Sequence, residues 1–282
     1  MSSSRTPRKA SAGVKPERRP GIRRDERPKP RPDRARGSES PGQRARPDLI
    51  YGRNAVLEAA RAGHVKRALV ADGLDADPRL DELATLTRVE IVSRERLEAL
   101  AHGNHQGVAA ELAPREFSNL RGLLASSPTL VLGLDGIQDP QNLGAILRSA
   151  DAAGVDGVVL PERRSAPVTG AVVKASSGAS EHLRLVRVSG MASAVSDIKR
   201  AGLWCVALDV NGEQSPWEFD FTQPVCIVVG GEEGVHRLVR QRCDARLRIP
   251  MAGRVDSLNA SAATAALLYE VTRQRSIESS AR

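Results

Sequence analysis

The pattern of apolar and polar positions along the chain predicts two α/β units. From residue 129 onward, apolar runs typical of strands alternate with segments of helical periodicity. The run at 225–229 is apolar throughout and mostly β-branched, as expected for a strand that is buried on both faces. We expect strands at 129–134, 157–160, 183–188, 203–208 and 225–229, and helices at 142–153, 191–201 and about 257–273. This order predicts a parallel sheet covered by helices.

Residues 48–112 predict a smaller α/β unit before that domain. We expect its helices at 53–61, 78–86 and 94–100, and its strands at 67–71, 90–92 and 107–112. Between the two units, the Pro and Ser residues of 113–128 are typical of a linker, and residues 169–180 predict a loop. The predicted organisation is a tail at 1–47, a small domain at 48–112, a linker at 113–128, a larger domain at 129–275 and a short tail at 276–282.

Positive charge is concentrated at the N-terminal end of the chain. Residues 1–47 hold 15 of the 42 Lys and Arg residues and 5 of the 34 Asp and Glu residues, so the rest of the chain holds 27 and 29. This tail has too few apolar residues to bury the surface that folding requires. We expect a disordered basic tail that attracts the phosphate backbone of RNA in a salt-dependent way. A solubilising extension is the alternative interpretation.

The sequence also disfavours several classes of protein. No apolar run approaches the roughly 18 residues of a membrane span, and residues 1–20 lack the apolar stretch of a secretory signal. Cys205, Cys226 and Cys243 lack metal-ligand spacing, so we expect buried, reduced thiols, no metal and a cytoplasmic location. A dinucleotide-dependent oxidoreductase is disfavoured, because no G-x-G-x-x-G opens a helix after a strand.

Two segments of the larger domain place an apolar run directly before a turn rich in Gly, Asn or Asp. The first runs from Leu134 to Arg148. The second covers 227–232 and continues to 249–251 and 257–259. In open α/β sheets, ligands bind at the carboxyl ends of the strands. Two such edges in one domain predict a nucleotide-like cofactor beside a second substrate.

These stretches, in this order, resemble the three motifs of the SpoU family. The first begins with Asn142-Leu143-Gly144 and ends at Arg148, the second is Gly-Gly-Glu at 230–232, and the third combines Ile-Pro-Met at 249–251 with Ser-Leu-Asn-Ala-Ser at 257–261. The resemblance covers about 129–275. It implies a trefoil-knotted α/β fold of the SPOUT class, S-adenosylmethionine as cofactor, 2′-O-methylation of a ribose in RNA, and a homodimer.

A weaker resemblance covers 48–112. Tyr-Gly-Arg-Asn-Ala-Val at 51–56 and His-Gln-Gly-Val-Ala at 105–109 are similar to the opening and closing motifs of the small substrate-binding domain that many SpoU enzymes carry. The resemblance implies that this domain contacts RNA. Ordinary turn chemistry is the alternative for both motifs.

The resemblance also implies roles for particular residues. Arg148 lies off the apolar stripe of its helix, and we expect it to lean over Gly144 toward the free N–H groups at the helix start, which favour an anion. Because a guanidinium is a poor base at neutral pH, an electrostatic role or a phosphate contact is favoured. The catalytic candidates are Asn142, Arg148, Glu232, Ser257 and Asn259, and the cofactor-binding candidates are Gly230, Ile249, Met251 and Leu258.

Local alternatives exist for some of these candidates. Asn142 and Ser257 are equally suited to cap the helices that begin near them. Gly230 with its neighbour also suits an ordinary turn. The stretch after Gly230 is one residue shorter than the usual family pattern, which leaves Glu232 and Glu233 as candidates for the motif acid. We expect Glu232.

The closest match is to the branch of the family that methylates a guanosine in large-subunit (23S) rRNA. Residues 248–253 and 257–259 are the main reason. A tRNA ribose methyltransferase of the same family is one alternative, although that branch typically lacks or replaces the N-terminal unit. A catalytically silent RNA-binding or ribosome-assembly protein is the other.

Overall fold

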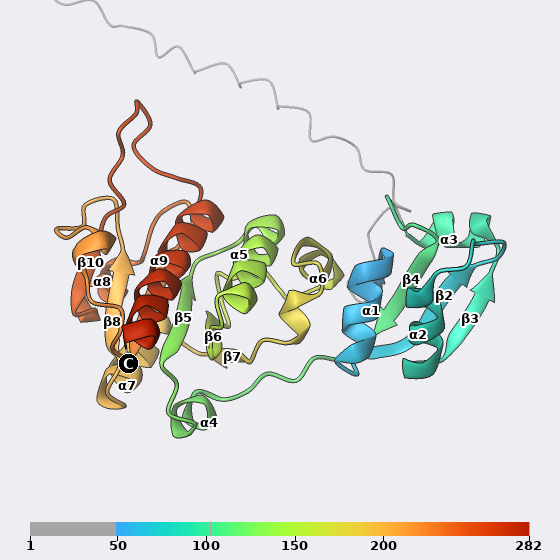
Figure 1. Ribbon diagram of the computed structural model, residues 1–282, viewed down its shortest axis with the longest axis horizontal. Helices are drawn as coiled ribbons and strands as arrows, with labels where there is room; N and C mark the ends of the chain where they lie inside the picture. The colour runs from blue at the N-terminus through green and yellow to red at the C-terminus, as the bar shows by residue number, and fades with distance from the viewer. Residues whose placement is uncertain (1–48, 102, 282) are drawn as a thin grey trace, which may run out of the picture. The chain divides into compact units, whose positions relative to one another are not determined.

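A parallel sheet of six strands forms the centre of the larger domain in a computed structural model that describes residues 49–101 and 103–281 (Figure 1). The strand order is β10-β8-β9-β5-β6-β7, and every pairing in this sheet is parallel. The strands are β5 (Leu130–Asp135), β6 (Gly157–Pro161), β7 (Leu185–Val188), β8 (Trp204–Leu208), β9 (Val225–Gly230) and β10 (Ala245–Leu247). The predicted fold class is thereby confirmed. The basic tail predicted at 1–47 lies outside the described residues.

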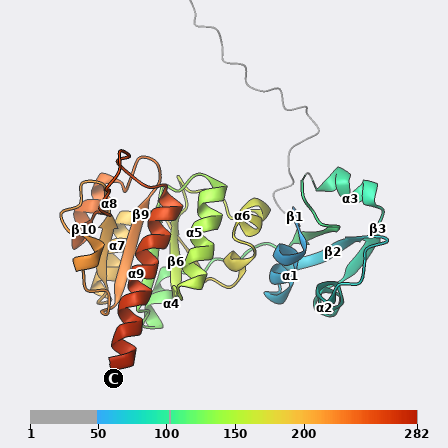
Figure 2. The ribbon, with the colours of Figure 1, turned by 45° about the horizontal axis from the view of Figure 1, so that its top comes forward.

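Helices cover both faces of this sheet. On β5, Leu130 and Leu132 point into a core that includes side chains of α5 (Pro140–Ala152) and α9 (Ala260–Ala281). Val131 points to the opposite face. There it packs with α4 (Leu120–Ala125), α7 (Met191–Arg200) and α8 (Arg237–Arg242). Figure 2 shows α5 and α9 in front of the strands and α7 behind them. Burial on both faces accounts for the continuous apolar run of β9.

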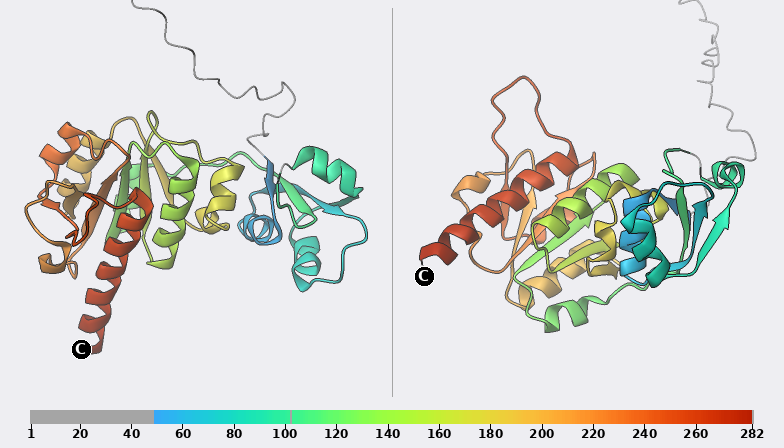
Figure 3. Two further views of the ribbon diagram at one scale, coloured as in Figure 1. Left: turned by 90° about the horizontal axis from the view of Figure 1, so that it is seen from above. Right: turned by 45° about the vertical axis from the view of Figure 1, so that its right-hand side comes forward.

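The small domain has a mixed four-stranded sheet with the order β1-β4-β2-β3. In the left view of Figure 3, α3 lies on one side of this sheet and α1 and α2 lie on the other. The helices are α1 (Arg53–Arg61), α2 (Pro78–Leu86) and α3 (Arg94–Leu100), and the strands are β1 (Leu49–Tyr51), β2 (Val65–Ala71), β3 (Val89–Val92) and β4 (Val108–Leu112). All three predicted helices are confirmed. The sequence did not predict β1, because three residues are too few to show an alternating pattern.

Several short elements differ from the predictions. The segment 113–128, predicted as a linker, contains α4, whose first turn is capped by a hydrogen bond from the Gly122 N–H to Asn119 Oδ1 (2.7 Å). The segment 169–180, predicted as a loop, contains α6 (Gly170–Ala175) and leads into a 3₁₀ turn (Ala179–Glu181). Neither α8 nor β10 was predicted. Elements of three to six residues carry too few apolar positions for a helical or strand period to be read.

The structure also bears on the thiols and on membrane association. Cys205 and Cys226 are buried, Cys243 is half-buried, and none of them forms a disulfide. Burial raises the pKa of the Cys243 thiol to about 12, so this thiol stays protonated at neutral pH. Within residues 49–101 and 103–281, none of the helices combines the length and apolarity of a membrane span.

Candidate active site

The two central strands of the sheet end at the same level. β5 pairs with β9 over six residues, from Leu130 opposite Val225 to Asp135 opposite Gly230. The Gly231 N–H then donates to the Asp135 carbonyl (3.1 Å), and a Cβ atom on Gly231 would lie only 2.1 Å from the Gly136 carbonyl oxygen. Only a glycine allows this approach of two backbones. The loops that follow β5 and β9 are therefore held side by side.

The loop after β5 leads directly into α5. Asp139 caps this helix, since its side chain accepts hydrogen bonds from the N–H groups of Gln141 (3.2 Å) and Asn142 (3.0 Å), and Pro140 occupies the first helical position. The alternative that Asn142 is the cap is therefore wrong. Asn142 is the third residue of the helix, and its side chain is available for another partner.

That partner is Asn259, 117 positions away in the chain. Asn259 Nδ2 donates to Asn142 Oδ1 (2.9 Å). Asn259 Oδ1 accepts from both the backbone N–H (2.8 Å) and the hydroxyl (2.6 Å) of Ser261, as an N-cap of α9 does. The alternative that Ser257 caps this helix is therefore also wrong. The structure thus joins the first and third family motifs through one side-chain hydrogen bond.

The stretch between β10 and α9 carries the other residues of the third motif. It projects from the domain in Figure 1 and in the right view of Figure 3. Ile249 and Met251 are half-buried, whereas Ser257 and Leu258 are exposed, with 41% of Leu258 accessible. The start of this stretch lies beside the loop that follows β8, because the Arg248 N–H donates to the Gln214 carbonyl (2.9 Å).

Exposed apolar side chains also occur in the loop after β8. Val210 is 57% exposed, and it directly follows the buried Asp209. Asp209 accepts hydrogen bonds from Arg240 Nη1 (2.7 Å) and from the Asn211 N–H (2.9 Å). Burial raises the pKa of Asp209, but these hydrogen bonds outweigh burial and hold the pKa below its usual value. The Asp209 carboxylate fixes the loop, so Val210 is presented to solvent just beyond the carboxyl end of β8. The sequence analysis missed both Asp209 and Val210.

A tight turn follows Gly230. The Gly234 N–H donates to the Gly231 carbonyl (2.9 Å), and Gly234 has a φ of +75°, which favours glycine. Glu232 and Glu233 occupy the tip of this turn, and both side chains are exposed. The stretch after Gly230, which is one residue shorter than the usual family pattern, thus forms a compact turn at the end of β9. This turn places two carboxylates at the edge of the sheet.

Arg148 does not lie as expected. A Cβ atom on Gly144 would lie 2.4 Å from Ala175 Cβ, so the space above Gly144 is occupied by α6 and not by Arg148. Arg148 is exposed, and its Nη1 donates to the Ser177 hydroxyl (3.2 Å), just beyond α6. Six positions separate Arg148 from Asn142 on α5. At about 100° per residue, the two side chains leave the helix in directions about 120° apart.

Comparisons with known proteins agree with this arrangement. The model of the SpoU rRNA Methylase family matches residues 129–269, and the model named RNA 2′-O ribose methyltransferase substrate binding matches residues 49–118. A Staphylococcus saprophyticus protein described as a TrmH family tRNA/rRNA methyltransferase is 40% identical over 239 residues, which cover 80% of this chain and 96% of that protein.

Two solved structures of methyltransferases are also similar to this chain. The SpoU methyltransferase AviRb of Streptomyces viridochromogenes, in complex with the cofactor AdoMet (S-adenosylmethionine), is 28% identical with a TM-score of 0.70, and the match covers 80% of this chain and 89% of that one. An RNA 2′-O ribose methyltransferase is 32% identical with a TM-score of 0.66 and a coverage of 80% and 88%.

Fold, motifs and relatives together define the class as S-adenosylmethionine-dependent RNA methyltransferases of the α/β-knot type. Within that class, the chain belongs to the SpoU family, whose TrmH-like members are its relatives.

The close approach at Gly231 can be tested by adding one methyl group. In Gly231→Ala, the new Cβ meets the Gly136 carbonyl, a backbone atom that cannot move without shifting the strand ends. We expect the free energy of unfolding to fall by about 1–3 kcal/mol in urea denaturation. Gly253→Ala is the control, because no atom lies within 4 Å of its added Cβ. Equal midpoints for the two variants would contradict the packing described here.

The hydrogen bond between Asn142 and Asn259 can be separated from the capping of α9. Asn142→Ala leaves the Asn259 cap of α9 intact but removes Asn142 Oδ1, the acceptor of the Asn259 amide. We expect a stability close to that of the native protein and a methyl-transfer rate lowered at least tenfold, because the two motifs lose their register. Asn259→Ala, which removes both interactions, serves as comparison and should also lose about 0.5–2 kcal/mol of stability. Undiminished transfer by Asn142→Ala would show that the contact is not needed for the reaction.

Proposed function

We propose that this protein transfers the methyl group of S-adenosylmethionine to the ribose 2′ hydroxyl of one guanosine in large-subunit (23S) rRNA. The observation that carries the proposal is the hydrogen bond from Asn259 to Asn142, which unites two family motifs at the carboxyl ends of the strands. An AdoMet-bound rRNA methyltransferase from Sinorhizobium meliloti, 26% identical with a TM-score of 0.69, supports rRNA as the substrate. The sequence at 248–253 supports the large-subunit branch. Reduced thiols support a cytoplasmic location.

The residues at the sheet edge fit the cofactor. Ile249, Met251 and Leu258 provide apolar side chains that the domain leaves partly uncovered, as a flat adenine ring requires. Gly230 ends β9 at this edge, and its missing side chain makes room for the Gly234 backbone, 2.0 Å from where a Cβ atom would lie, so Gly230 contributes its backbone and the tight turn that follows it. When bound, S-adenosylmethionine supplies an electrophilic methyl group on its sulfonium. We assign the four residues to holding it.

The remaining candidates act on the RNA. Asn142 and Asn259 hold the start of α5 and the start of α9 in one geometry, which positions the ribose. A guanidinium is a poor proton acceptor and a good phosphate ligand, so we assign Arg148 to holding a phosphate or polarising the 2′ hydroxyl and not to accepting the proton. Glu232 and Ser257, both exposed at this edge, complete the polar surface that faces the ribose.

The direction of Arg148 supports a homodimer. Since Arg148 leaves α5 about 120° away from Asn142, we propose that Arg148 of one copy completes the site of the other. Helix α9 offers a surface for such an assembly. Its Ala-rich first half allows close packing, and its Tyr269 and Ile277 side chains are 56% and 57% exposed.

The proposal predicts the behaviour of Arg148→Ala. Loss of the guanidinium should lower the rate of methyl transfer at least about one hundredfold. The affinity for S-adenosylmethionine should stay within about twofold of that of the native protein. The assay follows labelled methyl into undermodified large-subunit rRNA, small-subunit rRNA and tRNA, with nuclease mapping of the product. Arg200→Ala, an exposed Arg on α7, is the control and should transfer normally.

The distribution of label decides among the candidate functions. Label on a single large-subunit guanosine supports the proposal. Label on tRNA would move the substrate to tRNA, in line with the tRNA/rRNA description of the Staphylococcus relative. With no label and no cofactor binding, the silent RNA-binding protein would replace the enzyme. Normal transfer by Arg148→Ala would remove this residue from the mechanism.

The basic tail predicts a second effect. Deleting residues 1–46 removes the whole N-terminal excess of positive charge, so RNA affinity should fall and its logarithm should depend less steeply on the logarithm of salt concentration. Filter binding from about 50 to 200 mM salt measures both quantities. A slope equal to that of the full chain would show that the tail is not a phosphate-binding arm.

A further inference from the structure

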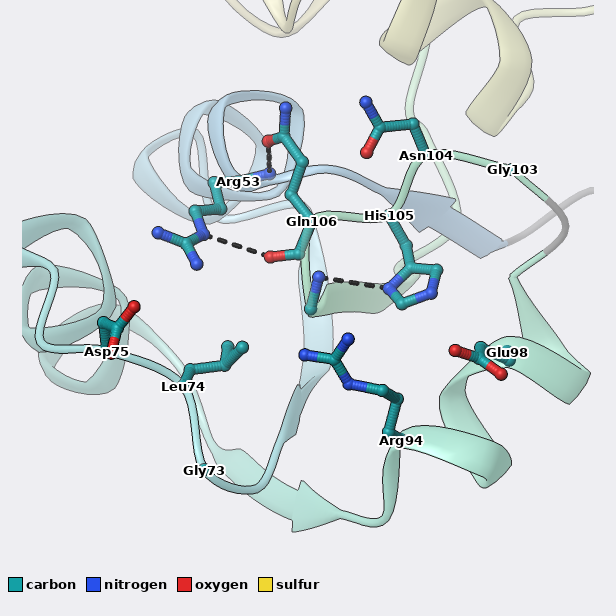
Figure 4. A pocket seen from close by; sticks show the side chains of 11 residues that line it. Arg53, Gly73, Leu74, Asp75, Arg94, Glu98, Gly103, Asn104, His105 and Gln106 are labelled. Atoms are coloured by element: carbon teal, nitrogen blue, oxygen red, sulfur yellow. Dashed lines mark hydrogen bonds between the residues drawn. The ribbon is translucent and has the colours of Figure 1, made fainter.

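A hollow of about 440 Å³ lies in the small domain, formed by parts of the chain that carry both of its motifs. Figure 4 shows its walls. Arg53 at the start of α1 and the loop at 103–107 form one side, Leu74 and Asp75 form another, and Arg94 and Glu98 rise from α3. The volume lies in the range of small-ligand sites and suits a single nucleotide.

The loop that forms one wall is held in an unusual conformation. Gln106 has a φ of +51°, a region that residues other than glycine rarely adopt. Arg53 holds it there, because its backbone N–H donates to Gln106 Oε1 (3.1 Å) and its Nε donates to the Gln106 carbonyl (3.1 Å). Arg53 is itself fixed by Asp77. A strained conformation that neighbouring residues maintain in this way is typical of a binding site.

The polar groups around the hollow are arranged for a ligand with both donors and acceptors. Arg94 and Glu98 stand four positions apart on α3, yet they form no salt bridge with each other, nor a hydrogen bond with any side chain in the described part of the chain. A phosphate would gain from Arg94 but would be repelled by Glu98 and Asp75. A nucleobase edge, in contrast, uses both a donor and an acceptor.

His105 adds a donor and a flat surface. Its Nδ1 accepts a hydrogen bond from the Gly107 N–H (3.1 Å), so in the neutral ring the proton is on Nε2. The ring is therefore oriented by the backbone, and its half-buried face is suited to stacking on a base. Leu74 packs over Gly107, where an added Cβ would lie 2.6 Å from both Leu74 methyl groups, and thus forms an apolar surface nearby.

We propose that this hollow binds one unpaired guanine of the RNA, distinct from the nucleotide whose ribose is methylated. Guanine is the base that presents two acceptors, O6 and N7, to a guanidinium and two donors, N1–H and N2–H, to a carboxylate. Arg94 matches the first pair and Glu98 the second. Bases of single-stranded loops are available for such contacts, whereas bases in an RNA helix are not. The inference rests on the proposed function only in taking RNA as the ligand.

The test compares the affinity of the full chain, without cofactor, for the RNAs UUGUU and UUAUU. We expect the native protein to bind the guanine-containing RNA about tenfold more tightly. Contributions from the phosphates and from the basic tail are equal for both RNAs, so they cancel in the ratio. Arg94→Ala and Glu98→Gln should reduce the ratio to about one. Arg96→Ala is the matched control, because Arg96 lies on the same helix but pairs with Glu90 (3.1 Å).

The outcomes separate this inference from the proposed function. A ratio of about one in the native protein, or an equal effect of Arg94→Ala and Arg96→Ala, would overturn the guanine site even if methyl transfer is normal. A tenfold preference that only Arg94→Ala and Glu98→Gln abolish would support it even if no methyl transfer is found. Glu98→Gln leaves the volume of the side chain nearly unchanged, so this variant should fold normally. It therefore still tests the site if Arg94→Ala folds poorly.

Discussion

The pairing of β5 with β9 is the constraint on which the rest of the structure depends. These strands lie at the centre of the sheet, with helices on both faces, and they pair without an offset from Leu130 and Val225 to Asp135 and Gly230. Because parallel strands in register end at the same level, the loops that follow them meet at one edge. A shift of one residue would exchange the side chains that a strand contributes to the two cores, so both cores would have to repack. The position of the active site is therefore fixed by core packing.

Close backbone contacts then hold the loops and helices around this edge in place. Gly231 rests on the Gly136 carbonyl, and Gly144 allows α6 to pack directly against α5. Such contacts suit a chain with only 2% aromatic residues, since small and β-branched side chains allow elements to pack closely. The motif glycines thus serve packing as much as ligand access. This explains why Arg148 is displaced toward Ser177.

The two domains present two kinds of surface. At the edge of the large sheet, exposed apolar and polar side chains lie on a projecting segment, which suits a site completed by a bound cofactor. In the small domain, Arg53 and Asp77 hold the walls of a hollow in place before any ligand arrives. A rigid recognition site costs little ordering entropy when RNA binds.

The sequence by itself determined the chemistry of the motifs and those helices and strands that are long enough to show a repeating pattern of apolar residues. Helices such as α1 and α2 were predicted to the residue, since each shows more than two turns of apolar periodicity. Short elements such as α8 and β10 were missed for the lack of such a pattern. Only the tertiary structure decided that Asp139 and Asn259 are the caps, that α6 fills the space above Gly144, and that Asn142 meets Asn259. These facts depend on contacts between distant parts of the chain, and a local pattern carries no information about which distant residue will fill a given space.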